Sequence, residues 1–123
     1  MSLPETINLT EAYKFVTAQW TPKILAQVNN QYVKIAKIQN EFVWHKHDDS
    51  DELFFIVKGQ LKMQYEGRDV HLNEGDIHVV PKGVMHNPYA ENECYVMFIE
   101  TTDTSHTGDV VTERTRSIDE QLY

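Results

Sequence analysis

The chain has little of several features that would direct it to a particular compartment or partner. It contains a single cysteine, Cys94, so no disulfide can form within it, which fits a reducing cytosol. None of its apolar runs approaches the ~20 residues of a membrane-spanning helix. Its first residues lack the charged-then-apolar pattern of a secretory signal. These absences predict a cytoplasmic protein without a membrane partner.

Basic residues are also scarce relative to acidic ones. The chain has 11 lysines and arginines against 19 aspartates and glutamates, which gives a formal net charge of −8. Nucleic acids and anionic membranes select proteins with a basic face, so we expect neither as a partner. Solubility alone accounts for the acidic balance. A length of 123 residues, with 41% apolar and 24% charged residues, fits one domain with one modest core.

The middle of the chain is β in character. Its apolar residues alternate with polar ones or form short blocks, separated by turns rich in Asn, Gly and Pro. The predicted strands are residues 23–28, 31–38, 41–47, 53–57, 60–65, 70–72, 77–80, 86–90 and 94–100. Short strands joined by tight turns predict an all-β sandwich or barrel.

We divide the chain into three parts. Residues 1–22 form an N-terminal segment, in which Asn8 and Glu11 match a capping box and predict a short helix over 9–16 that covers an end or edge of the sheet. Residues 23–100 form the barrel. Residues 101–123 form a polar, extended C-terminal tail with a short helix at 118–122.

Two histidines stand close to a glutamate in the sequence. His45 and His47 are two apart, and residues i and i+2 of a strand point to the same face. A short acidic turn follows, and Glu52 then opens an apolar strand. Imidazole nitrogens and a carboxylate oxygen suit a divalent first-row transition metal. A fourth ligand is expected from elsewhere in the chain.

These residues belong to two spaced motifs that resemble the two signature motifs of the cupin superfamily. The resemblance covers residues 43–90, and the strand pattern extends it to about residue 100. The first motif is His45-x-His47, four residues, Glu52, six residues and Gly59. The second is Gly75, five residues, Pro81-x-Gly83, two residues and His86. Fifteen residues separate the two motifs, which is similar to the compact microbial members.

The resemblance implies a small jelly-roll β-barrel that forms a homodimer and holds one divalent metal through His45, His47, Glu52 and His86. Iron, manganese, nickel, zinc and cobalt are all admissible with these donors. Such a ligand set leaves positions open for water or a substrate. Four further residues are candidates to line the cavity, with plain core as the alternative for the apolar ones and a solvent-facing position for the histidine: Phe54, Ile56, His78 and Met97.

Three functions remain open at this stage. We favour an enzyme that acts on a small polar metabolite, as a non-haem dioxygenase. The second hypothesis is a sugar isomerase or epimerase, because small chains of this kind resemble the barrel of phosphomannose isomerases. The third is a module that binds a metal or a small-molecule ligand without turnover. No side chain near the ligands is identifiable as a general base, so we predict no catalytic residue, and the sequence does not decide among the three.

Overall fold

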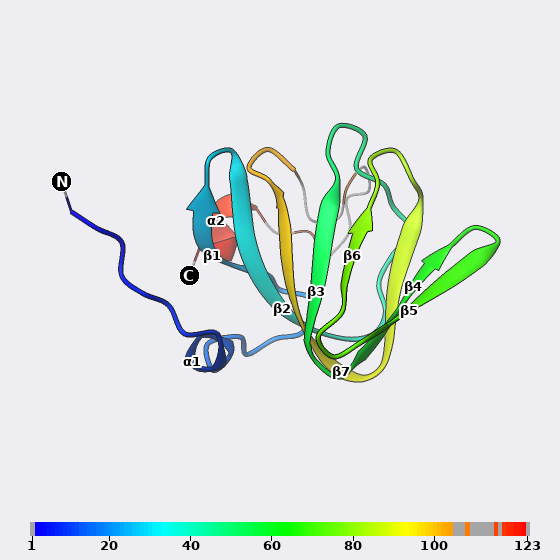
Figure 1. The fold of residues 1–123 in the computed structure, drawn as a ribbon, viewed down its shortest axis with the longest axis horizontal. Coiled ribbons are helices and arrows are strands. Elements are labelled where there is room, and N and C mark those ends of the chain that lie inside the picture. Colours follow the sequence, from blue (N-terminus) through cyan, green and yellow to red (C-terminus); the bar gives the residue numbers. More distant parts are fainter. Residues whose placement is uncertain (1, 105–107, 109–114, 116, 123) are drawn as a thin grey trace.

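The structure, a computed structural model, describes residues 2–104, 108, 115 and 117–122. Within this part of the chain, antiparallel strands form a seven-stranded sheet that curls into a barrel (Figure 1). The strands are β1 (Lys23–Val28), β2 (Gln31–Glu41), β3 (Glu52–Lys58), β4 (Gln60–Tyr65), β5 (Arg68–Asn73), β6 (Ile77–Val80) and β7 (His86–Thr101). The fold is an all-β jelly-roll, as predicted.

Strand β7 connects the two sides of the barrel because it pairs with three other strands. Its first part pairs with β4 and its second part with β3, while β2 runs along both. The sequence predicts two strands here, and the structure joins them through the exposed residues 91–93. The register with β2 shifts at this point. Because extra residues on one side of a ladder bend the strand, a single strand serves both sides.

Residues 41–47 do not form the strand that the sequence predicts. Strand β2 extends to Glu41, and within the following stretch only His45 makes a bridge, to His86. Asn40 has a φ of 65°, a left-handed conformation that Asn tolerates better than most residues, and this bends the end of β2. Strand alternation is therefore not what places His45 and His47 together, although both side chains are buried.

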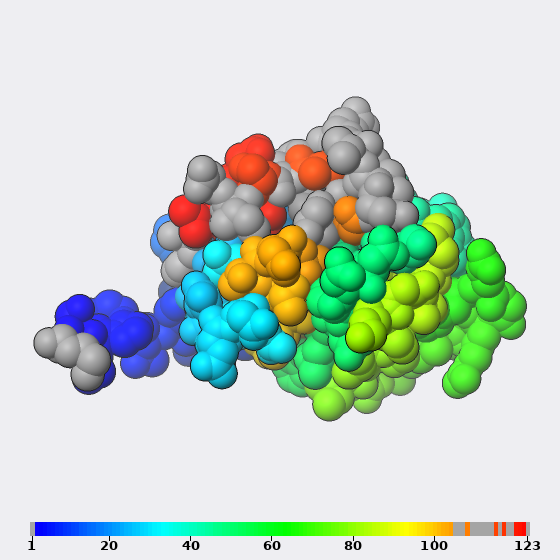
Figure 2. Space-filling view, turned by 90° about the horizontal axis from the view of Figure 1, so that it is seen from above, coloured from blue at the N-terminus to red at the C-terminus, as the bar shows by residue number. Residues whose placement is uncertain are grey.

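Helix α1 (Leu9–Tyr13) covers the outer face of the sheet. Its cap is the predicted one, since the Asn8 side chain accepts a hydrogen bond from the Glu11 amide at 3.1 Å. The helix ends earlier than predicted, at Tyr13, whose hydroxyl donates to the Val96 carbonyl at 2.5 Å. Ahead of this helix, the first residues lead away from the barrel (Figure 2). None of the helices in the described ranges is long and apolar enough to span a bilayer.

The predicted C-terminal helix is present as α2 (Ile118–Gln121). It lies beside β1, where Leu122 makes a parallel bridge to Ile24. The expectation of an extended tail falls mostly on residues 105–107, 109–114, 116 and 123, which lie outside the described residues.

The inner face of the barrel is apolar at one end and polar at the other. Alternate residues of three neighbouring strands point inward and form the core, in which each large aliphatic or aromatic side chain contributes about 1.5–3 kcal/mol when fully buried: Ala36, Ile38, Phe54, Ile56, Cys94, Val96 and Phe98. The same alternation continues to three buried charged residues, Lys34, Glu52 and Glu100. This polar end contains the candidate site.

Candidate metal centre

The four predicted ligands lie together inside the barrel. Nitrogen atoms of His45, His47 and His86 lie within 4.8 Å of one another. Glu52 Oε1 lies 3.4 Å from His47 Nε2 and 3.9 Å from His86 Nε2. None of the four residues is more than 5% exposed. The structure therefore brings three imidazoles and one carboxylate into a single buried cluster.

Two of the imidazoles are oriented by the backbone just before them. His45 Nδ1 lies 2.8 Å from the Val43 carbonyl oxygen, and His86 Nδ1 lies 2.9 Å from that of Val84. A carbonyl oxygen only accepts hydrogen bonds, so each Nδ1 carries the hydrogen. The lone pair then belongs to Nε2, the nitrogen that a metal ion would bind.

The turn before His86 also fixes the loop that carries His47. The Gly83 amide donates to the His47 carbonyl at 2.7 Å, and the Lys82 amide donates to Asp51 Oδ1 at 2.9 Å. Gly83 has a φ of 77°, which glycine adopts without strain. The spacing of the second motif thus places a turn against the first motif, and Asp51 of the acidic turn holds that contact.

The electrostatics of the cluster fit a divalent cation. Burial lowers the pKa of His86 to about 4, so this imidazole is neutral near pH 7. Its buried Nε2 has no hydrogen-bond partner among the described residues, an arrangement that costs free energy unless another group satisfies the lone pair. Burial also raises the pKa of Glu52, against the opposing effects of Glu100 and Lys34. A metal ion would satisfy the nitrogen and neutralise the carboxylate, but these donors do not select one metal.

A second carboxylate, which the sequence analysis does not consider, lies beside Glu52. Ligand atoms of Glu100, Glu52 and His47 lie within 4.8 Å of one another. Burial, and then the charge of Glu52, raise the pKa of Glu100 well above its usual range, while Lys34 opposes this. The signal for Glu100 is present in the sequence, because it follows Val96 and Phe98 at a spacing of two and so continues the inward face of β7.

An apolar cavity opens beside this cluster. Among the described residues, its lining contains two titratable side chains, those of His45 and Glu52, together with Trp20, Pro22, Ala36, Ile38, Phe42, Phe54, Pro88, Val96 and Phe98. The rings of Trp20 and Phe42 stack with centroids 4.6 Å apart, and the Phe42 ring meets His45 at 5.5 Å. About 40 Å³ is open to the centres of water-sized molecules, room for roughly three waters or one small apolar group.

The predicted cavity residues have different positions. Phe54 lines the cavity, and Ile56 is buried in the adjoining core. Met97 does not line it: it packs with Ile35 on the outer face of the sheet. Inward positions on β7 are the even-numbered ones, so Val96 and Phe98 line the cavity in its place.

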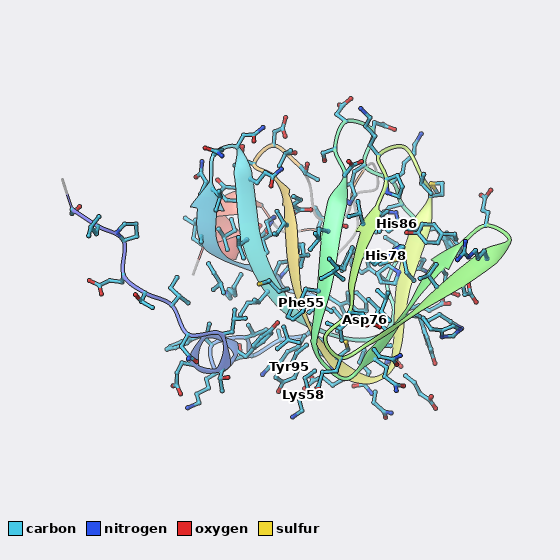
Figure 3. The ribbon with its side chains drawn as sticks, viewed as in Figure 1. Phe55, Lys58, Asp76, His78, His86 and Tyr95 are labelled. Carbon is cyan, nitrogen blue, oxygen red and sulfur yellow. The ribbon has the colours of Figure 1, made fainter. Side chains whose placement is uncertain are left out.

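His78 is half-buried and belongs to a polar pair rather than to the apolar wall. Its Nε2 lies 2.6 Å from the Tyr65 hydroxyl. Tyr65 is the cross-strand neighbour of His86, so the pair borders the candidate metal centre. His78 and His86 are both visible on the same side of the barrel in Figure 3.

The family model of the cupin domain matches residues 31–101, more than half of the chain. The chain belongs to the cupin family. This cupin is similar to a solved cupin-2 domain protein from Shewanella frigidimarina, with 37% identity, a TM-score of 0.76, and coverage of 77% of this chain and 93% of that one. The resemblance found in the sequence is thereby confirmed.

Two relatives from Bacillus subtilis (strain 168) match over shorter shares of their own length. The uncharacterized protein YdbB is 35% identical over 63 residues, which are 50% of this cupin and 56% of YdbB. Quercetin 2,3-dioxygenase is 25% identical over 92 residues, which are 70% of this cupin and 27% of the dioxygenase. The cupin therefore spans about half of the first relative and about a quarter of the second.

Proposed function

We propose that this cupin is a metal-dependent enzyme of the non-haem dioxygenase type that acts on a small metabolite. The observation that carries the proposal is the position of the apolar cavity, whose lining includes His45 and Glu52. A metal held by His45, His47, Glu52 and His86 would supply Lewis acidity or redox chemistry at that wall. The similarity to quercetin 2,3-dioxygenase supports this reaction class.

The cavity walls narrow the kind of substrate. Trp20, Phe42 and Phe98 present ring surface that binds a flat apolar group and excludes water. The polar part of the substrate would then contact the side of the cavity formed by His45 and Glu52. A sugar, with hydroxyl groups on all sides, would leave several of them without hydrogen bonds against these walls. The proposed substrate is therefore a small molecule whose polarity is confined to one end.

The test measures oxygen consumption. The protein is tag-free, is purified without nickel affinity chromatography, and is loaded with Fe²⁺ under anaerobic conditions. We expect oxygen uptake that requires both iron and a substrate, in a panel of short aliphatic enols and β-diketones, whose apolar end suits a cavity of about 40 Å³. The matched variants are His86→Ala, which should lose uptake, and His71→Ala on the exposed side of β5, which should keep it.

Two further assays, sugar conversion without oxygen and melting temperature with added ligand, could contradict the proposal. Anaerobic conversion of a sugar with zinc or manganese would favour an isomerase. A rise in melting temperature with a compound that is never converted would favour a binding module.

The homodimer and the cytoplasmic location stay predictions. For the first, size-exclusion chromatography with light scattering should give about twice the chain mass of 14.4 kDa.

A further inference from the structure

A lysine and a glutamate form an ion pair in the barrel interior. Lys34 on β2 is 0% exposed and Glu100 on β7 is 1% exposed, and Lys34 Nζ lies 2.6 Å from Glu100 Oε1. Removing two charges from water costs several kcal/mol per ion, so a fully buried pair of this kind is uncommon. Neither residue belongs to the proposed ligand set.

The pair lies directly behind the carboxylate of that set. Leu53 of β3 is in register with Ile99 of β7, so the preceding and following residues, Glu52 and Glu100, are neighbours on the inner face. The distances agree, since the two carboxylates and His47 form one group within 4.8 Å. Two buried acidic groups thus face the same point, and Lys34 is paired with only one of them.

The C-terminal helix α2 completes the arrangement. Gln121 is 1% exposed, and its Oε1 accepts a hydrogen bond from Lys34 Nζ at 2.5 Å. The Lys34 ammonium is therefore held between Glu100 of the barrel and Gln121 of the helix. A residue of helix α2 contributes in this way to the interior next to the candidate metal centre.

We propose that Lys34 and Glu100 are positioning residues of the metal centre, and that Gln121 holds Lys34 in place. Pairing with Lys34 keeps the Glu100 carboxylate out of the coordination sphere, so Glu52 is the carboxylate that binds the metal. This inference rests on the proposed metal site but not on the dioxygenase reaction.

The proposal predicts opposite changes in metal affinity for substitutions of Lys34 and Glu100. Lys34→Met removes the charge and keeps most of the volume, so two buried carboxylates lose their nearby ammonium and a divalent ion would neutralise them more favourably than in the parent. Metal affinity should rise about tenfold, while the metal-free protein loses stability. Glu100→Gln leaves the ammonium near Glu52, the other buried acidic residue described on the inner face, where it competes with the metal. Metal affinity should then fall about 10- to 100-fold, the size of effect seen for groups that orient ligands.

The experiment measures the affinity of metal-free protein for Co²⁺, by its absorption spectrum in competition with a chelator, together with melting temperatures with and without Co²⁺. Lys62→Met is the matched control, because Lys62 forms a partly exposed ion pair with Asp69 at 3.9 Å. It should leave the affinity unchanged. Gln121→Leu removes the hydrogen bond to Lys34, so it should raise the Co²⁺ affinity as Lys34→Met does, but by less. It replaces Lys34→Met in the experiment if that variant does not fold.

A purely structural role would move the affinities differently. If Lys34→Met and Glu100→Gln both weaken Co²⁺ binding, or both leave it unchanged, the positioning role is wrong. If Gln121→Leu stands in for Lys34→Met, weaker or unchanged binding overturns it equally. A parent protein that binds no Co²⁺ overturns the metal site and this inference with it. Normal Co²⁺ binding by a protein that never consumes oxygen would contradict only the proposed reaction.

Discussion

His45 and His86 are joined by two backbone hydrogen bonds, one in each direction. The His45 amide donates to the His86 carbonyl at 3.0 Å, and the His86 amide donates to the His45 carbonyl at 2.9 Å. Their rings lie with centroids 4.3 Å apart. Two proposed ligands from distant parts of the sequence therefore share one rigid backbone unit, so the geometry of the centre is set by the fold before any ligand binds.

Metal content should depend on the buried cluster and not on histidine in general. We expect Glu52→Gln and His86→Ala to lower metal content at least tenfold, because each removes one of four donors and leaves the others buried. Elemental analysis of protein expressed without added metal gives the measurement. His71→Ala, in which an exposed histidine is lost, should keep the content of the parent. Equal metal in all three variants would mean that the ion binds elsewhere.

The stability of the metal-free protein should fall in mild acid because of His86. Its pKa is about 4 in the folded protein against 6.5 for an ordinary histidine, so the unfolded chain binds the proton more tightly. This contribution is complete above pH 6.5 and is lost as the pH falls through about 4. The loss should amount to about 2 kcal/mol by pH 5.

Urea unfolding at pH 7.5 and pH 5 with a chelator present measures this loss. Burial raises the pKa of Glu52 and Glu100, so these two groups make the free energy of unfolding rise as the pH falls, opposite to the effect of His86. The parent is therefore compared with His86→Ala at both pH values, because the two carboxylates are present in both proteins. The parent should lose about 2 kcal/mol more than the variant between the two pH values. An identical loss in both would contradict a buried neutral imidazole at this position.

Some features of the candidate site could be predicted from the sequence and others could not. The spacing of His45, His47, Glu52 and His86 indicated the cluster, because fixed spacings in a known motif carry three-dimensional information. The strand proposed for 41–47 is absent, since Asn40 and the single bridge at His45 replace regular pairing. The motif spacing therefore predicted the cluster, whereas the strand that was expected to place His45 beside His47 is absent.

Lys34 and Glu100 could not be assigned a role from the sequence, although strand alternation indicates that both side chains point inward. Alternation on β7 places Glu100 inward, and the prediction of Met97 as a cavity residue is one residue out of phase with this inner face. Lys34 is far in the sequence from both of its partners, Glu100 and Gln121, the second of which is 87 residues away. Contacts of this kind depend on the register between strands and on where a helix docks, neither of which local patterns specify.

Trp20 should report on the cavity, and Trp44 should not. The chain has two tryptophans, of which Trp20 lines the cavity and is 9% exposed, while Trp44 is 41% exposed and lies outside that lining. In Trp44→Phe, fluorescence should be quenched when Co²⁺ or a short β-diketone binds. In Trp20→Phe, the quenching should fall severalfold. Equal quenching in the two variants would place the ligand away from the apolar cavity.

Gly108 should matter for the metal centre through its contact with the segment that carries the histidines. A Cβ at this position would collide with the Lys46 carbonyl oxygen and lie 2.9 Å from His45 Cδ2. Gly67 is a matched control, because its φ of 76° is similar to the 64° of Gly108 but nothing lies within 4 Å of its Cβ position. Alanine at either position costs about 1–2 kcal/mol of backbone strain. Only Gly108→Ala must also displace its neighbours, so it should weaken Co²⁺ binding about tenfold, whereas Gly67→Ala should bind like the parent. Equal Co²⁺ affinity in the two alanine variants would show that this contact does not support His45.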